Sequence, residues 1–196
     1  MNKQIQNKQS IIFKRLTGSF IGCAIGDSLG LPIEFVDKPK DLIITELLGN
    51  SDRDIDVGDW SDDTSMTLCL GTSILENDWD LNDQLSRYKD WLHEGYMCCK
   101  QYSFGSGGTT RKAIEDYINT GSIINNKEFE KCGNGSLMRI SPIVWGYFHQ
   151  GYETVVDLAG KSSITTHAHP ICIGVCRLAG SLLYNIINGV KLDQLY

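Results

Sequence analysis

Apolar residues recur at intervals of three to four through most of the chain, a pattern typical of helices that bury one face. Between about residues 9 and 28 the repeat is set by Ile12, Phe13, Leu16, Phe20, Cys23 and Ala24. The same period predicts helices from Ser61 to about Glu76, from Leu81 to Glu94, over 110–118, over 153–164 and over 169–188. Few segments alternate like strands, so we expect an all-α fold of six or seven helices, with function carried on the connections.

Glycines form a ridge along the first of these helices. Gly18, Gly22, Gly26 and Gly30 recur every four residues. Each interior glycine costs about 1 kcal/mol relative to alanine in a helix. Such a ridge is tolerable where another backbone approaches closely, so this spacing predicts a helix at the centre of the fold.

Composition describes one ordinary globular domain over residues 1–196, with 41% hydrophobic and 21% charged residues. The net charge of -6 argues against bulk binding to nucleic acid or to an anionic membrane. An anionic small ligand would need local backbone amides, a few basic side chains or a bound cation.

We expect no targeting signal in this sequence. The start of the chain is polar without a signal-peptide core, no apolar run is judged to approach transmembrane length, and Lys14, Arg15 and Asp27 argue against a spanning first helix. The seven cysteines include no Cys-x-x-Cys pair, which favours reduced thiols. We therefore expect a cytoplasmic protein.

The densest group of oxygen ligands lies in the segment from Gly58 to Thr64. Ser61, Asp62 and Asp63 combine a hydroxyl with adjacent carboxylates, the donor set of a hard cation such as magnesium, calcium or manganese. The simpler interpretation is a helix N-terminus, with Ser61 as N-cap and the two acids in the first turn. The two interpretations are compatible, because a capped helix can project acids into a cleft.

Other polar features lie on connections and are ambiguous when taken singly. Glu34 follows Pro32 just beyond the expected end of the first helix and is either a general acid/base or a surface carboxylate. The loop around Gly105, Gly107 and Gly108 is either a linker or a nest of amides for phosphate. The turn at Asn134, Gly135 and Ser136 has the same two interpretations.

Arg139 and two histidines complete the set of candidates. Arg139 is either an anion contact or, as we favour, a buried partner for an acid. In Thr166-His167-Ala168-His169, the histidines suit hydrogen bonding or capping better than metal binding, because the surroundings are helical.

Taken together and in order, these motifs resemble the ADP-ribosylglycohydrolases. Residues 22–34 are similar to the opening motif of that family, and Trp60–Met66 to its metal motif, usually written Thr-Asp-Asp-Thr. Residues 133–142 match its Gly-Asn-Gly-x-x-Met-Arg segment, and Thr166-His167 its Thr-His segment. The resemblance covers roughly residues 12–185.

The resemblance implies a compact orthogonal bundle of helices that hydrolyses the glycosidic bond between ADP-ribose and a protein side chain or related acceptor. It implies two Mg²⁺ ions, with Mn²⁺ as an alternative, and assigns Ser61, Asp62 and Asp63 as ligands. Asp62 and Asp63 together with Glu34 are then the catalytic residues. The substrate-binding residues it implies are Gly105, Gly107, Gly108, Asn134, Gly135, Ser136 and His167.

The chain departs from the family pattern in one respect. The second metal motif of the family, Asp-x-Asp-Thr near the C-terminus, does not occur among these 196 residues. We therefore expect a C-terminally truncated or naturally short domain with weak magnesium binding. The alternative function is a catalytically impaired relative that binds ADP-ribose or acts structurally.

Overall fold

The regular structure is helical throughout the described part of the chain. The computed structural model describes residues 3–37, 39, 41–123 and 132–195, and no strand occurs among them. The α-helices are α1 (Lys3–Gly30), α2 (Asp62–Asn77), α3 (Leu81–Glu94), α4 (Gly108–Thr120), α5 (Ser141–Tyr147), α6 (Tyr152–Ser163) and α7 (Pro170–Asn188). The all-α prediction is confirmed, and five of the expected helices begin and end within two residues of their predicted limits.

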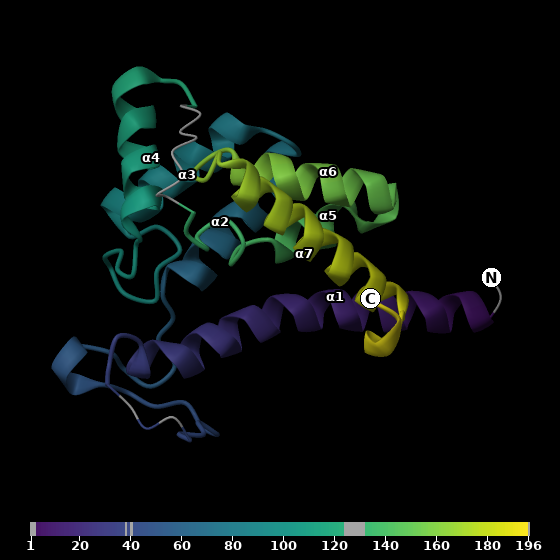
Figure 1. Ribbon diagram of the computed structural model, residues 1–196, viewed down its shortest axis with the longest axis horizontal. Coiled ribbons are helices and arrows are strands. Elements are labelled where there is room, and N and C mark those ends of the chain that lie inside the picture. Colours follow the sequence, from purple (N-terminus) through teal and green to yellow (C-terminus); the bar gives the residue numbers. More distant parts are fainter. Residues whose placement is uncertain (1–2, 38, 40, 124–131, 196) are drawn as a thin grey trace.

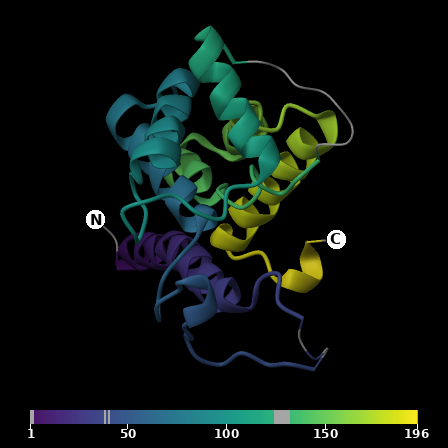
Figure 2. The ribbon, with the colours of Figure 1, turned by 90° about the vertical axis from the view of Figure 1, so that its left-hand side faces the viewer.

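The long helix α1 runs along one side of the molecule and the remaining helices gather above it (Figure 1). Helices α6 and α7 pack against each other, and α2 lies against both α3 and α5. The core forms where these helices meet; its largest apolar side chains are Trp91, Tyr88, Met66, Leu70, Leu85, Ile114, Ile140 and Ile143. Residues 31–37, 39 and 41–58 extend from the C-terminal end of α1 as a largely irregular segment (Figure 2).

Local sequence accounts for several helix ends. The Asp80 carboxylate accepts hydrogen bonds from the backbone N–H groups of Asn82 and Asp83, so it caps α3. The His169 ring accepts from the N–H of Ile171 at the start of α7, which confirms the capping role predicted for one histidine. Gly95 and Gly189 end their helices with positive φ, which glycine adopts without strain.

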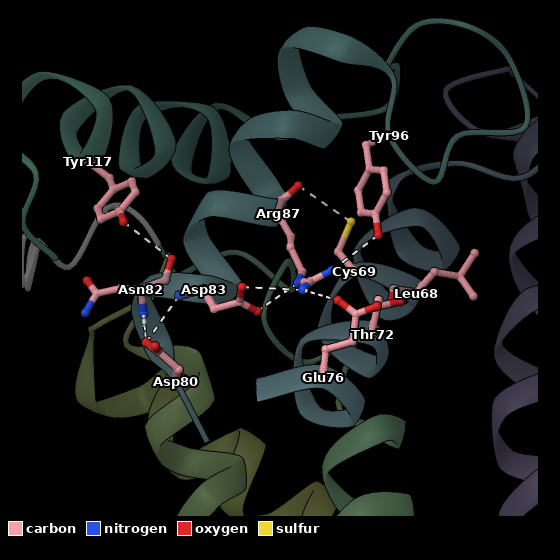
Figure 3. Close-up of polar contacts among 10 residues, drawn as sticks. All are labelled: Leu68, Cys69, Thr72, Glu76, Asp80, Asn82, Asp83, Arg87, Tyr96 and Tyr117. Carbon is pink, nitrogen blue, oxygen red and sulfur yellow. Dashed lines mark hydrogen bonds and ion pairs between the residues drawn. The ribbon is translucent and has the colours of Figure 1, made fainter. Parts of the chain in front are cut away.

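Arg87 ties α2 to α3 through a group of polar contacts (Figure 3). Its guanidinium lies 2.7 Å from Asp83 on its own helix and 2.7 Å from Glu76 on α2. It also donates to the Tyr96 hydroxyl at 3.3 Å. Because the Arg87 side chain is largely buried, these charged hydrogen bonds help to fix the angle between α3 and α2, whose first turn carries Asp62 and Asp63.

The prediction that the glycine ridge lies at the centre of the fold is wrong. A methyl group added at Gly18, Gly22, Gly26 or Gly30 would meet nothing within 4 Å. The ridge faces open space, because α1 packs on the bundle with only part of its circumference. Phe13, Ile21 and Ile25 on the same helix are also exposed.

The chain contains longer apolar helical segments than we expected. Two segments, Gln9–Ile33 and Pro170–Asn188, are long and apolar enough to cross a membrane by length and composition alone. The expectation that no apolar run approaches this length is therefore wrong. Both helices contact the rest of the bundle with only part of their surface, and Arg15 of α1 donates to the Ile187 carbonyl of α7 at 3.0 Å.

Candidate active site

The acidic segment begins at a helix N-terminus whose cap comes from another helix. Asp27, near the end of α1, accepts from the backbone N–H of Ser61 at 2.9 Å and from that of Thr64 at 3.0 Å. Both hydroxyls also donate to the Asp27 carboxylate, each at 2.7 Å. Ser61 holds the N-cap position as predicted, but its side chain makes no capping bond because Asp27 has taken that role.

Four carboxylates lie near one another at this helix end. Burial, together with the charges of Asp63, Asp27 and Glu34, raises the pKa of Asp62 to about 7. Burial likewise raises the pKa of Asp63 to about 6, with Asp27 and Glu34 adding to the effect. A buried acid cluster of this kind carries more negative charge than its protein surroundings compensate, which is common at functional sites.

The donor chemistry of this cluster suits a hard cation, but the ligand set is incomplete. The Ser61 hydroxyl lies 2.7 Å from one Asp27 oxygen and 3.4 Å from one Asp63 oxygen, so three oxygen donors converge. Within residues 3–37, 39, 41–123 and 132–195, no three His, Cys, Asp or Glu side chains form a group that could hold a metal. Ser61, Asp62 and Asp63 have the oxygen chemistry that a magnesium ion prefers, and their role as metal ligands stays a prediction.

The glycine loop before α4 contacts these acids directly. Gly105 has a φ of +83°, and a methyl group added there would lie 2.7 Å from a carboxylate oxygen of Asp62. Gly107 is the N-cap of α4 and Gly108 its first residue. Nothing lies within 4 Å of a methyl group added at either glycine, so the backbone here is open to a ligand.

A cleft of about 470 Å³ lies beside the glycine loop. Glu34 and Gly105 line it, which places a predicted catalytic acid and the predicted diphosphate loop on the same cavity. Two arginines, Arg53 and Arg111, line it as well. They supply the local positive charge that the net charge of the chain does not, although neither was among the residues predicted from sequence.

Glu34 is held at the mouth of this cleft by Arg53. The Arg53 guanidinium donates to the Leu31 and Glu34 carbonyls, each at 2.8 Å, and lies 3.8 Å from the Glu34 carboxylate. The carboxylate is 43% exposed, so this ion pair is weak and leaves Glu34 free to turn toward a ligand. The next residue, Phe35, is 90% exposed with a φ of +56°, a strained conformation of the kind found at ligand sites.

The second glycine turn packs against His167 and the start of α4. A methyl group on Gly135 would lie 2.9 Å from the His167 ring and 2.8 Å from the Thr110 hydroxyl. His167 is 3% exposed, and its ring nitrogen Nδ1 lies 2.8 Å from the Thr166 hydroxyl. The first turn of α4 therefore lies next to both predicted binding segments. Gly105 precedes the helix, Gly108 is its first residue, and Gly135 lies against Thr110 in its first turn.

Two residues of this turn have different surroundings. Asn134 is exposed, and its side chain makes no hydrogen bond among the described residues. Ser136 is buried, its hydroxyl accepts from Ser163 at 2.8 Å, and it contacts the Cys176 thiol at 3.4 Å. Asn134 can therefore contact a ligand with its side chain, whereas Ser136 can do so only through its backbone.

The interpretation of Arg139 as a buried partner for an acid is half right. Arg139 is fully buried, but its guanidinium pairs with no carboxylate in the described part of the chain. Its acceptors are a carbonyl and two threonine hydroxyls. Arg139 pairs with neutral groups because its surroundings offer neutral oxygen atoms, from the glycine turn and from the residues just after α6.

Comparison with known proteins agrees with this geometry. The family model described as ADP-ribosylglycohydrolase matches residues 8–196. The chain belongs to the ADP-ribosylglycohydrolase family. A solved structure titled "ADP-ribosylglycohydrolase-related protein complex" is 31% identical, with a TM-score of 0.80. The match covers 95% of this chain and 60% of the chain in that structure. The fold of this family member is thus that of an ADP-ribosylglycohydrolase.

Two curated relatives show how much of a family protein the chain represents. It is 30% identical to "ADP-ribosylarginine hydrolase Tri1" of Serratia proteamaculans, over 91% of this chain and 49% of that protein. It is 27% identical to "ADP-ribosyl-[dinitrogen reductase] glycohydrolase" of Rhodospirillum rubrum, over 91% of this chain and 60% of that protein. The chain therefore spans about half the length of the curated relatives it matches.

Proposed function

We propose that this chain forms the ADP-ribose-binding part of a hydrolase that removes ADP-ribose from a modified protein side chain. The observation that carries the proposal is that Glu34 and the Gly105 loop line one cleft in a member of this family, and that the same loop packs against Asp62. In this proposal the glycosidic bond would lie near these acids, beside a loop suited to a diphosphate.

The diphosphate would lie on the amides of Gly107 and Gly108 at the N-terminus of α4. Backbone N–H groups at a helix N-terminus bind anions without net positive charge on the protein. Arg111 is on the same helix, and its guanidinium donates to the Ser106 hydroxyl at 2.7 Å on the rim of the cleft. Asn134, Gly135 and His167 would contact the rest of the ligand from the second turn.

The acids would act at the ribose end of the ligand. Ser61, Asp62 and Asp63 would hold Mg²⁺, with Mn²⁺ as an alternative, and a bound cation would polarise ribose hydroxyls and water. Glu34 would move a proton to or from the attacking water or the leaving group, since it is half-exposed and held only weakly. We place this activity in the cytoplasm, because all seven cysteines are free thiols.

The activity is tested by incubating the chain with a protein bearing ADP-ribosylated arginine and magnesium, and measuring released ADP-ribose. Arginine-linked substrate is the first choice because the Serratia relative is named for that linkage. Because the metal ligand set is incomplete, we expect little or no release by this chain alone. In a longer chain that contains these residues and an Asp-x-Asp-Thr motif, we expect release and its loss in Asp62→Ala and Asp63→Ala, with Glu46→Ala, an exposed acid, as control. Equal release by all four proteins would contradict the proposal.

The alternative function is binding without catalysis. It is favoured by the incomplete group of metal ligands among the described residues and by the share of the relatives that the chain covers. Tight binding of ADP-ribose, unchanged by magnesium or a chelator and without any release from the modified protein, would support this alternative over hydrolysis.

A further inference from the structure

Arg139 is a buried cation surrounded by neutral partners. The terminal nitrogen Nη1 donates to the Gly135 carbonyl at 2.6 Å. The other terminal nitrogen, Nη2, donates to the hydroxyls of Thr165 at 2.9 Å and Thr166 at 2.8 Å. The guanidinium carbon lies 4.7 Å from the centre of the Tyr88 ring. Since each of these partners is neutral, none of them cancels the charge of Arg139, and this charge acts on the neighbouring ring of His167.

The Thr166 hydroxyl is shared between Arg139 and His167. It accepts from Arg139, and the same oxygen lies 2.8 Å from Nδ1 of His167. A guanidinium has no acceptor atom, so of these two partners only Nδ1 of His167 can accept a hydrogen bond from the Thr166 hydroxyl. If Nδ1 carried the hydrogen instead, this hydroxyl hydrogen would lose that acceptor in a residue that is 4% exposed. An unpaired buried donor costs about 1–3 kcal/mol, so Nδ1 is the acceptor.

The proton of the neutral ring must then lie on Nε2. Burial and the Arg139 charge lower the pKa of His167 to about 4, so the ring is neutral near pH 7. Within the described part of the chain, Nε2 has no hydrogen-bond partner of its own. It faces the glycine turn, where a methyl group added at Gly133 would lie 3.2 Å from it.

We infer that Arg139, acting through the Thr166 hydroxyl, is a positioning residue that fixes His167 as the Nε2–H tautomer. His167 thereby offers a hydrogen-bond donor to a phosphate or hydroxyl group lying on the turn formed by Gly133–Ser136. The identity of that ligand rests on the proposed function, whereas the tautomer depends only on contacts within the chain. Without the relay through Thr166, the neutral ring would offer an acceptor at Nε2 in part of the molecules.

The tautomer is measured directly by the ring ¹⁵N chemical shifts of the labelled chain at pH 7. The chain has four histidines, so His167→Gln assigns the signals of His167. We expect Nε2–H in the wild type and in Thr166→Ser, which keeps the hydroxyl. Thr166→Val keeps the shape but removes the hydroxyl, and we expect the Nδ1–H population to rise by at least about tenfold, as loss of a hydrogen bond worth about 1.4 kcal/mol requires.

Either of two results would overturn the inference: an Nδ1–H tautomer in the wild type, or an unchanged tautomer in folded Thr166→Val. The first needs no variant, so the inference stays falsifiable if Thr166→Val fails to fold. Adding ADP-ribose separates this inference from the proposed function. A correct tautomer whose signals do not respond to ADP-ribose would support the relay and count against ADP-ribose as the ligand.

Discussion

Asp27 and Ser61 are joined by two hydrogen bonds across 34 positions of the chain, one from the backbone N–H at 2.9 Å and one from the hydroxyl at 2.7 Å. The same carboxylate also holds the N–H and hydroxyl of Thr64. A carboxylate that caps a helix from outside fixes the position of that helix as well as stabilising it. The position of Asp62 and Asp63 in the first turn of α2 therefore depends on Asp27.

Replacing Asp27 with alanine should destabilise the chain by about 2–3 kcal/mol, because four hydrogen bonds to the start of α2 are lost. Removing one charge from the acid cluster offsets part of that loss. Urea denaturation measures the change, with Asp37→Ala, an exposed acid, as the control. Equal free energies of unfolding for the two variants would contradict the capping role.

Gly105 and Gly108 make a matched pair in the glycine loop. Gly105→Ala should cost about 1–2 kcal/mol for the left-handed backbone, and more for the contact with Asp62, since the added methyl group meets that carboxylate at 2.7 Å. Gly108→Ala adds a methyl group in open space at the start of a helix, so its stability should be unchanged or slightly higher. Thermal unfolding of both variants decides the matter, and equal melting temperatures would show that the loop does not press on Asp62.

Magnesium should stabilise the chain through Ser61, Asp62 and Asp63. At a concentration ten times the dissociation constant, binding to the native state adds about 1.4 kcal/mol to the free energy of unfolding. For a chain of this size that raises Tm by about 3–6 °C. Scanning fluorimetry with magnesium chloride, against sodium chloride of equal ionic strength, measures the rise. The same rise in a variant with both Asp62→Asn and Asp63→Asn would refute binding at these residues.

His167 should make the chain less stable in acid. Its pKa is lowered to about 4 in the folded chain, against about 6.5 when unfolded. Below pH 6.5 the unfolded state therefore binds the proton more readily, and stability falls as the pH drops toward 4, by roughly 3 kcal/mol at most. The drop between pH 7 and pH 4.5 should be smaller in His167→Gln, and this difference isolates His167 from carboxylates that titrate nearby. Identical drops in the two proteins would refute this prediction.

The helices were predictable because their signals are local. Apolar spacing predicted α3 and α7 to within one residue of their ends, and one histidine was expected to act as a cap, as His169 does at α7. These signals need no knowledge of which segments meet in space. The same local patterning predicted Ser61 at the N-cap of α2, although not the carboxylate that performs the capping.

What the sequence could not predict depends on contacts between distant segments. The cap from Asp27, the arginines of the cleft and the neutral partners of Arg139 all join residues from different elements. The glycine ridge was misplaced because a periodic pattern shows that a face is smooth, not whether another backbone covers it. Family resemblance supplied the candidate site residues, and their roles stay predictions.

The most direct test of the account is a calorimetric titration of the chain with ADP-ribose, beside ADP and ribose 5-phosphate. We predict that ADP-ribose binds more tightly than either of its parts, because the glycine loop that would hold the diphosphate lines the cleft and also packs against Asp62, where the ribose would lie. Gly105→Ala, which presses on Asp62, should weaken that binding. Absence of binding by ADP-ribose, or equal affinity for ADP-ribose and ADP, would contradict the proposed site.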